Sequence, residues 1–187
     1  LDWVVLIAAS PVLVPIGVVI GACVALTSRG PVLFRQERVG LNGESFEVYK
    51  FRSMVHGDNP LVPDPTRITR VGAVLRRWSL DELPQLLNVA KGEMSAVGPR
   101  PPVSSPVECY TQEQARRLTV RPGLTGLAQV SGRNSLAWAD RIDLDLAYID
   151  SRSLRRDVDI LVRTVSTVLT GEGADGHDAD DPMLADG

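Results

Sequence analysis

The first part of the chain limits what the protein can fold into, because the 24 residues from Trp3 to Leu26 carry no formal charge. A straight helix over this stretch would be about 36 Å long, enough to cross a hydrocarbon core of about 30 Å. Pro11 and Pro15 each remove one helical hydrogen bond, and Ser10 precedes a proline, which biases it away from the α region. We predict a helix that bends near its middle, where a Ser hydroxyl partly satisfies the carbonyls left bare.

Three interpretations of this apolar stretch compete: a cleaved signal peptide, a kinked transmembrane helix, and a helix-break-helix hairpin that enters and leaves the bilayer by the same face. The signal peptide is least favoured, because no basic segment precedes the stretch. Physical chemistry alone leaves the spanning and the re-entrant forms open, since kinked spanning helices are well tolerated. The chain starts at Leu1 without an initiator methionine, so we expect native residues to precede it.

The remaining residues have ordinary polarity, and the chain is long enough for one domain. Residues 171–187 hold six acids, no Lys or Arg and several glycines, so we predict a disordered acidic tail. Without this tail, 20 basic residues face 17 acidic ones, a balance that suits an anionic membrane surface or phosphates. Two cysteines, Cys23 and Cys109, do not make a disulfide framework, so a reducing cytoplasm is the default expectation.

Residues 31–55 predict a β-hairpin, because β-branched and aromatic runs flank an Asn42-Gly43 pair. In an extended second arm, Lys50 and Arg52 share one face while Phe51 points to the other. This pattern gives a basic face beside an apolar one. A solvated strand face has the same pattern, so it does not by itself indicate a site.

Residues 66–90 carry apolar side chains at helical spacing with an interruption near Ser79, which predicts two amphipathic helices. Ser79 and Glu82 have the spacing of a capping box, which places Asp81 and Glu82 in the first turn of the second helix. Acids there complement the helix dipole and need no function. The same dipole would lower the pKa of a carboxylate and keep it ionised, as a carboxylate nucleophile or a Mg²⁺ ligand requires.

Two later segments are candidates for phosphate contact. Arg100 lies in the stiff run Val97-Gly98-Pro99-Arg100-Pro101-Pro102, which is suited to hold a guanidinium against a phosphate or to act as a rigid linker. Residues 121–126 and 131–134 combine Gly, hydroxyls and Arg, as in a loop whose backbone approaches a diphosphate. Residues 138–169 predict a pair of amphipathic helices that form core or lie against the bilayer. His56 and His177 share no metal-ligand spacing, so zinc is not expected.

Taken together, several motifs closely resemble the bacterial sugar transferase family, the monotopic polyprenyl-phosphate phosphoglycosyl transferases. The resemblance runs in order from Asp2 to about Gly173, and it is carried by Lys50-Phe51-Arg52-Ser53-Met54, Ser79-Leu80-Asp81-Glu82-Leu83-Pro84-Gln85, residues 92–101 and Arg121-Pro122-Gly123-Leu124-Thr125-Gly126. It implies an α+β fold that is mainly helical with a small β-hairpin. It also implies three parts: a re-entrant membrane hairpin (1–28), a cytoplasmic catalytic domain with amphipathic interfacial helices (29–170), and the tail (171–187).

The resemblance further implies transfer of a phospho-sugar from a UDP-sugar to undecaprenyl phosphate, with Mg²⁺, at the inner face of the bacterial cytoplasmic membrane. UMP would be released, in the first membrane step of exopolysaccharide, capsule, O-antigen or glycoprotein glycan synthesis. The implied partners are these two substrates and the lipid bilayer, not nucleic acid, and a homo-oligomer stays open. An inactive membrane-anchored scaffold of the same fold is the alternative.

The family motifs also assign roles to particular residues of this chain. Asp81 would be the nucleophile that forms a covalent phospho-sugar intermediate, Glu82 its partner, and the pair would hold Mg²⁺. The implied substrate-binding residues are Lys50, Arg52 and Arg100 near the phosphates, Arg76 near the lipid head group, and Arg121 and Arg133 on the nucleotide side. Ser10-Pro11 matches the family's helix-breaking pair and favours the re-entrant form. Basic residues before Asp2 are absent, Arg152 replaces a Trp and Ser53 a Thr, but none of these departures affects the dyad.

Overall fold

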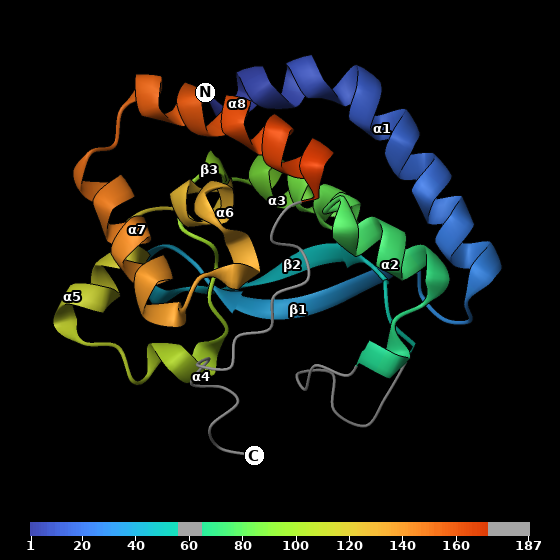
Figure 1. Ribbon diagram of the computed structural model, residues 1–187, viewed down its shortest axis with the longest axis horizontal. Helices are drawn as coiled ribbons and strands as arrows, with labels where there is room; N and C mark the ends of the chain where they lie inside the picture. Colours follow the sequence, from blue (N-terminus) through green and yellow to red (C-terminus); the bar gives the residue numbers. More distant parts are fainter. Residues whose placement is uncertain (56–64, 172–187) are drawn as a thin grey trace.

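The computed structural model describes residues 1–55 and 65–171, and the predicted acidic tail and both histidines lie outside this range apart from Gly171. The described chain is mainly helical with two small sheets (Figure 1). Its longer elements are α1 (Asp2–Thr27), β1 (Leu33–Val39), β2 (Ser45–Phe51), α2 (Arg70–Arg77), α7 (Trp138–Asp150) and α8 (Leu154–Thr170). The shorter helices and strands are η1 (Leu41–Gly43), η2 (Pro65–Arg67), η3 (Leu80–Gln85), α3 (Leu86–Lys91), β3 (Ser95–Val97), α4 (Ser104–Val107), α5 (Gln112–Ala115), η4 (Arg116–Thr119), β4 (Gly123–Thr125), α6 (Leu127–Ser131) and η5 (Arg133–Ser135). The predicted α+β class is confirmed.

Helix α1 stays helical through both prolines, so the predicted break takes the form of a bend within one continuous helix (Figure 1). Pro11 cannot donate a backbone hydrogen bond to the Ile7 carbonyl four residues earlier. The Ser10 hydroxyl donates to that oxygen instead, at 3.2 Å. This contact confirms the prediction that a Ser hydroxyl satisfies a carbonyl beside the prolines. Within the described residues, α1 is the one helix long and apolar enough to cross a membrane.

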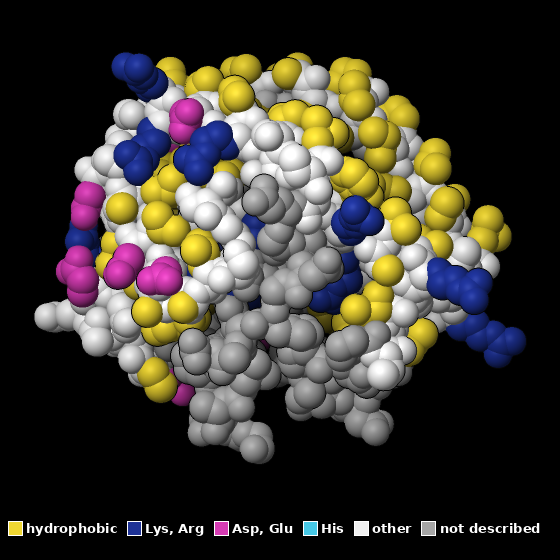
Figure 2. Space-filling view, in the orientation of Figure 1, with side chains coloured by type: hydrophobic (Ala, Val, Ile, Leu, Met, Phe, Trp, Pro, Cys, Tyr) yellow, Lys and Arg dark blue, Asp and Glu magenta, His cyan; other side chains and the backbone are white. Residues whose placement is uncertain are grey.

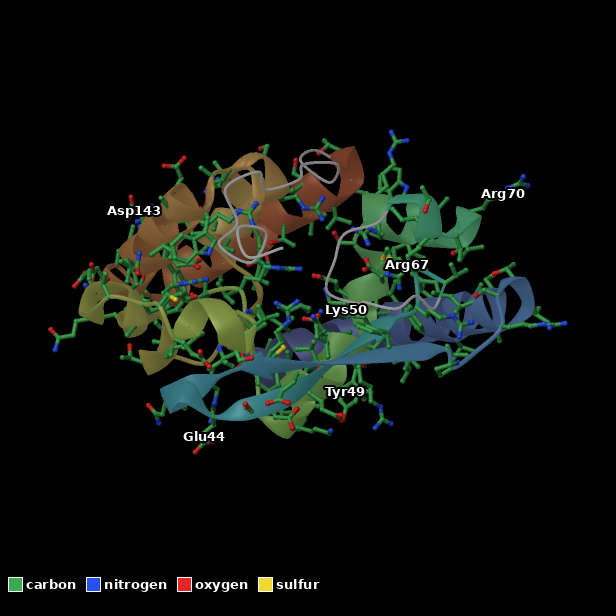
Figure 3. The ribbon with its side chains drawn as sticks, turned by 90° about the horizontal axis from the view of Figure 1, so that it is seen from below. Glu44, Tyr49, Lys50, Arg67, Arg70 and Asp143 are labelled. Atoms are coloured by element: carbon green, nitrogen blue, oxygen red, sulfur yellow. The ribbon has the colours of Figure 1, made fainter. Side chains whose placement is uncertain are left out.

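The predicted hairpin is confirmed, with β1 and β2 antiparallel in a register from Leu33 opposite Phe51 to Val39 opposite Ser45. Its turn runs through Asn42, whose φ of +56° is a conformation that Asn tolerates. Alternation along β2 sends neighbouring side chains to opposite sides, and Figure 3 shows Lys50 and Tyr49 separated in this way. Phe51 is buried with Ile20 and Val24 of α1. The hairpin therefore packs against the apolar helix α1 through Phe51.

A second, parallel pairing of β3 with β4, which the sequence did not predict, links the middle of the chain to the Gly-rich segment. Ala96 and Val97 of β3 are buried with Tyr148 of α7 and Ile160 of α8 in one core cluster. The pair of helices predicted for residues 138–169 is confirmed as α7 and α8. Together these elements enclose a cleft against the hairpin and α2.

Candidate active site

A cleft of about 1530 Å³ lies between the hairpin, the α2–η3 segment and the α6–α8 side of the molecule. Both dyad acids and most of the predicted cationic residues line it, from elements that are far apart in the sequence. The predicted site residues that line it are Lys50, Arg52, Arg76, Asp81, Glu82, Arg100 and Arg133. The fold thus brings together residues predicted from separate parts of the sequence.

The turn at Ser79 sets the direction of the dyad. Helix α2 ends at Arg77, and Ser79 adopts a left-handed conformation with φ +53°, from which the 3₁₀ helix η3 starts. The predicted capping box is wrong, because the Ser79 side chain makes no capping hydrogen bond. Its hydroxyl instead accepts a hydrogen bond from the Arg133 guanidinium. Ser79 therefore connects the dyad turn to the opposite wall of the cleft.

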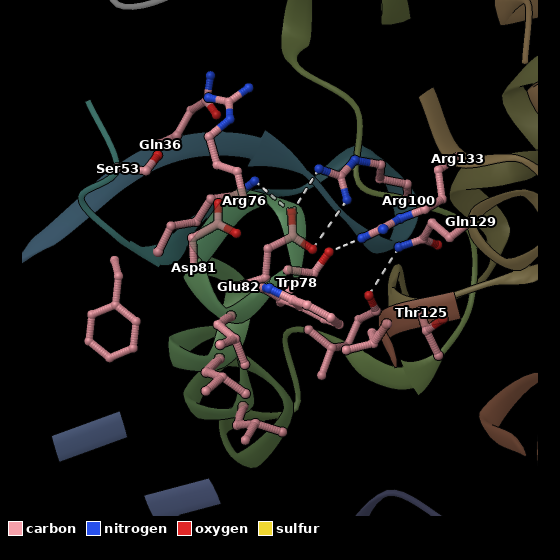
Figure 4. Close-up of a pocket in the computed structure, with 18 of the residues that line it drawn as sticks. Gln36, Ser53, Arg76, Trp78, Asp81, Glu82, Arg100, Thr125, Gln129 and Arg133 are labelled. Atoms are coloured by element: carbon pink, nitrogen blue, oxygen red, sulfur yellow. Dashed lines mark hydrogen bonds and ion pairs between the residues drawn. The ribbon is translucent and has the colours of Figure 1, made fainter. Parts of the chain in front are cut away.

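Glu82 is held by two cations. Its Oε1 lies 2.8 Å from Lys50 Nζ and 2.8 Å from Arg100 Nη2, and its Oε2 lies 3.4 Å from Arg100 Nη1 (Figure 4). Burial would raise the pKa of Glu82, but Arg100 and Lys50 outweigh it and hold that pKa well below its usual range. Burial in turn lowers the pKa of Lys50, whereas Glu82 raises that of Arg100. Glu82 is therefore a fixed negative charge that organises the cations around it.

Asp81 differs from its neighbour, because no hydrogen bond or ion pair to its carboxylate is present within residues 1–55 and 65–171. Burial and the adjacent Glu82 charge raise its pKa above the usual value. The prediction that a helix dipole lowers this pKa is therefore wrong. The acids lie in a short 3₁₀ helix of six residues rather than in the first turn of a long α-helix, so the macrodipole is small. The result is a half-buried, basic carboxylate with free oxygen atoms.

Two further arginines border the dyad. Arg76 is exposed and lies above Asp81 in Figure 4. Its Nη1 is 3.4 Å from Met54 Sδ. Arg133, from the segment after α6, reaches the cleft from the opposite side, and burial lowers the pKa of its guanidinium. The dyad thus lies between cations on both walls, a field that favours anionic ligands such as phosphates.

The other two predicted arginines are placed differently. Arg52 borders the cleft, but its guanidinium donates to the Ser28 carbonyl at 2.7 Å, to the Ser28 hydroxyl at 2.8 Å and to the Pro31 carbonyl. Arg121 does not line the cleft and lies instead in a separate hollow with Asp2 and Arg152. The structure therefore uses Arg52 to hold the end of α1, and it does not bring Arg121 to the dyad.

The Gly-rich segment packs against the protein's own backbone. A methyl group on Gly123 or Gly126 would lie within 2.2 Å of a Gly98 backbone atom, and one on Gly98 would lie 2.6 Å from the Arg121 carbonyl oxygen. The sequence predicted that a diphosphate approaches these glycines closely. In the structure, it is the protein's own backbone that lies this close to them. These glycines therefore fix the position of the Arg100 segment that follows Gly98.

Sequence reasoning missed one charged pair beneath the cleft. Arg117 of η4 and Asp145 of α7 are both buried, and Arg117 Nη2 lies 2.7 Å from Asp145 Oδ2. Both residues line the cleft. A signal was available, since Asp145 falls on the apolar side of a predicted amphipathic helix, where a carboxylate needs a partner.

The chain matches the sequence profile described as bacterial sugar transferase over residues 1–171. It is 47% identical over 155 residues to the uncharacterised sugar transferase EpsL of Bacillus subtilis, which covers 81% of this chain and 77% of that protein. It is 43% identical over 187 residues to the UDP-glucose:undecaprenyl-phosphate glucose-1-phosphate transferase of Caulobacter vibrioides, with 93% and 70% covered. It is also 43% identical over 166 residues to the undecaprenyl-phosphate galactose phosphotransferase of Salmonella typhimurium, with 78% and 35% covered.

These matches confirm the resemblance read from the motifs. The chain belongs to the bacterial sugar transferase family, and it is an enzyme of the phosphoglycosyl transferase class.

Proposed function

We propose that the enzyme transfers a phospho-sugar from a UDP-sugar to undecaprenyl phosphate through a covalent intermediate on Asp81. The observation that carries this proposal is the contrast within the dyad. Glu82 is bound by Lys50 and Arg100, whereas the Asp81 carboxylate has no partner within the described residues and lies beside them in the cleft. A carboxylate with a raised pKa is the more basic nucleophile of the two.

In the first step, an Asp81 oxygen attacks the β-phosphorus of the UDP-sugar, and the bond between that phosphorus and the bridging oxygen breaks. UMP leaves with the bridging oxygen and its electron pair. In the second step, a phosphate oxygen of undecaprenyl phosphate attacks the same phosphorus and restores the Asp81 carboxylate. Lys50, Arg76, Arg100 and Arg133 supply positive charge where phosphate oxygens become more negative.

The donor atoms of the dyad fit a Mg²⁺ ion. Mg²⁺ is commonly bound through one or two carboxylates together with substrate phosphates and water. Asp81 and Glu82 are adjacent carboxylates in the cleft, and the Asp81 oxygens have no partner within the described residues. The dyad would therefore hold the ion with the diphosphate as further ligand, and the ion would neutralise phosphate charge.

Both ends of α1 are tied to the catalytic body, which supports the re-entrant form over the spanning one. At one end, Asp2 Oδ1 accepts hydrogen bonds from the Ser95 hydroxyl at 2.9 Å and from the Ala96 amide at 3.0 Å. At the other end, Arg52 donates to Ser28. A spanning helix has its ends on opposite surfaces of the bilayer, so it could not keep both contacts with one body. These contacts support both ends and the catalytic body lying on one side of the membrane, and we propose that this is the cytoplasmic side.

An apolar surface continues this membrane attachment onto the body. Helix α8 exposes a stripe of apolar side chains at helical spacing, and α1 exposes apolar residues over most of its length. We call this the outer apolar face, formed by Trp3, Val4, Ile7, Val18, Val19, Leu154, Val158, Val162, Val165 and Leu169. Figure 2 shows hydrophobic side chains along the upper and right edge of the molecule, over α1, whereas the acidic side chains gather at the left. Such a surface suits the acyl boundary of a bilayer, where undecaprenyl phosphate is confined.

The test of the reaction is incubation with Mg²⁺ and a panel of UDP-sugars that begins with UDP-glucose and UDP-galactose, the sugars of the named relatives. Without lipid, we expect one turnover that releases UMP and adds a phospho-sugar mass to the peptide containing Asp81. Asp81→Asn should release UMP at least about 10³-fold more slowly, whereas Asp143→Asn on the exposed side of α7 should match the wild type. An Asp81→Asn variant that released UMP at the native rate would refute the covalent step. Turnover on any donor excludes an inactive scaffold.

The topology has its own test, in a background without Cys23 and Cys109. Single cysteines at Leu1 and Arg29 should both be protected from an impermeant reagent added outside sealed cells. Labelling of one position but not the other would show that the helix spans the membrane.

A further inference from the structure

The segment that carries Arg100 has few means of holding itself in place. Three of its residues, Pro99, Pro101 and Pro102, have no backbone N–H, so it cannot form a regular strand ladder. Instead, each of four successive carbonyl oxygens accepts a hydrogen bond from another part of the molecule. The donors are Gly123 N to Pro99 O at 2.8 Å, Arg117 Nη2 to Arg100 O at 3.3 Å, Arg38 Nη1 to Pro101 O at 3.1 Å, and Val39 N to Pro102 O at 2.9 Å. The carbonyl of Arg100 itself depends on Arg117.

Arg117 is in turn held on both sides. Its Nη2 binds Asp145 Oδ2 at 2.7 Å, and its Nη1 donates to the Tyr110 hydroxyl at 2.6 Å. Asp145 is 1% exposed, and its Oδ1 has no hydrogen-bond partner in the part of the chain that the structure describes. Burial raises the pKa of Asp145 to about 6 in spite of Arg117. Leaving a buried carboxylate half satisfied is costly, so the pair is a weak device for stability alone.

We propose that Arg117, held by Asp145, is a positioning residue that fixes the Arg100 segment and, through Arg100, the Glu82 carboxylate beside Asp81. The inference rests on the phosphoglycosyl transferase reaction proposed above. The chain of contacts is direct: Asp145 to Arg117, Arg117 to the Arg100 carbonyl, and the Arg100 guanidinium to Glu82 at 2.8 Å. One nitrogen, Arg117 Nη2, makes both of the first two contacts. A lysine at position 117 has a single side-chain nitrogen, so it could not bind the Tyr110 hydroxyl as well as Asp145 and the Arg100 carbonyl.

A double-mutant cycle tests this route. We expect Arg117→Lys to lower kcat about 10- to 100-fold, the usual range for residues that orient a first shell, with KM for the UDP-sugar within about threefold. In an Arg100→Lys background, Arg117→Lys should have almost no further effect, because the residue through which it acts has already been changed. Effects that multiply would overturn the proposal, since they would mean that Arg117 contacts substrate itself or acts through global stability.

The neighbouring Arg116 provides a matched control. It carries the same charge in the same helix, but it pairs with Glu113 and Asp150 on the surface. Arg116→Lys should leave kcat within about twofold of the wild type. If Arg117→Lys does not fold, Asp145→Asn keeps the shape of the carboxylate and should show the same loss of kcat and the same non-additivity with Arg100→Lys.

A readout without turnover separates this inference from the reaction on which it rests. In an experimental structure of Arg117→Lys or Asp145→Asn, the Arg100–Glu82 contact should be displaced relative to the unmodified protein. An unchanged contact would overturn the positioning role even if the enzyme were active. Conversely, the contact could be displaced in the variant while the unmodified protein turned over no UDP-sugar. This result would refute the proposed function and leave the structural role of Arg117 intact.

Discussion

The cleft and the outer apolar face differ in how completely their side chains are satisfied. In the cleft, the Glu82 carboxylate is bound by Lys50 and Arg100, whereas the Asp81 carboxylate has no hydrogen-bond or ion-pair partner within the described residues. On the outer apolar face, large side chains such as Trp3 and Val162 are each 66% exposed, with nothing in the described chain to cover them. One region places a carboxylate without a partner beside several cations, and the other exposes many apolar side chains.

This difference indicates what each region binds. A single free carboxylate among cations suits one reacting atom of an anionic substrate, for which position decides the rate. An extended apolar surface without polar partners suits a fluid phase such as the bilayer, for which area decides affinity. Substitutions in the cleft should therefore change rate constants, and substitutions on the face should change partitioning.

After Asp81→Asn, the largest effect is expected from Glu82→Gln. Removing this charge leaves Lys50 and Arg100 without their anion, and we expect kcat/KM to fall about 10²-fold or more. The variant also removes a negative neighbour that raises the pKa of Asp81, so the acid limb of the pH profile of kcat/KM should move to lower pH. Glu113→Gln, in a surface pair, is the control and should change neither quantity. An acid limb that stayed in place would show that Asp81 is not the group that must be ionised.

Gly98→Ala should have the next largest effect. Its new methyl group would lie 2.6 Å from the Arg121 carbonyl oxygen and 2.9 Å from the Gly123 amide nitrogen. Both atoms belong to backbone that has to move, so we expect the free energy of unfolding to fall by about 1–3 kcal/mol. Chemical denaturation in a bilayer mimetic measures this change. Gly17→Ala is the control, since its methyl group would find its nearest neighbour at 3.9 Å. Equal stability of both variants would mean that the Arg100 segment adapts, and that the cleft is less rigid than proposed.

The sequence predicted elements whose signal is local. The Asn42-Gly43 turn, the uncharged stretch around Pro11 and the helical periodicity of residues 138–169 each depend on neighbouring residues, and the structure contains all three elements. Lys50 and Asp81 were identified by family motifs rather than by any property of their own. Without those motifs, an acid pair after a serine has an equally good explanation as a helix cap.

The sequence could not predict contacts that depend on tertiary packing. Ser79 and Glu82 have the spacing of a capping box, but Ser79 adopts a positive φ and Glu82 binds Lys50 and Arg100, because cations from distant segments compete with the local hydrogen bond. For the same reason, Arg52 donates hydrogen bonds to Ser28 at the end of α1. The Arg117–Asp145 pair likewise joins segments 28 residues apart. No local sequence pattern encodes such pairs, so the residues that support the dyad can be identified only from the folded structure.

A smaller effect is expected from placing charge on the outer apolar face. Val162→Glu combined with Val165→Glu puts two carboxylates into the exposed stripe of α8, where they would need to remain hydrated. We expect binding to vesicles that contain anionic phospholipid to weaken about 10-fold, less than complete loss because α1 still inserts. Co-sedimentation measures this, with Gln112→Glu on exposed α5 as the control. If the double variant bound vesicles like the control, α8 would not contact the bilayer. The membrane-binding surface would then consist of α1 alone.

The smallest effect should come from Asp2→Ala, which removes the two hydrogen bonds that tie the start of α1 to Ser95 and Ala96. Hydrogen bonds to a charged group stabilise by about 1.5–3 kcal/mol when buried, and the partial exposure here should reduce this to about 1 kcal/mol. We expect faster hydrogen exchange in the first turns of α1 and in β3, with the rest of the body unchanged, and Asp143→Ala as a surface control. Because the Arg52 contact holds the other end of α1, kcat should change little. Unchanged exchange in α1 would show that its packing against the body, rather than Asp2, fixes that end, and it would weaken the argument that paired anchors keep the helix on one side of the membrane.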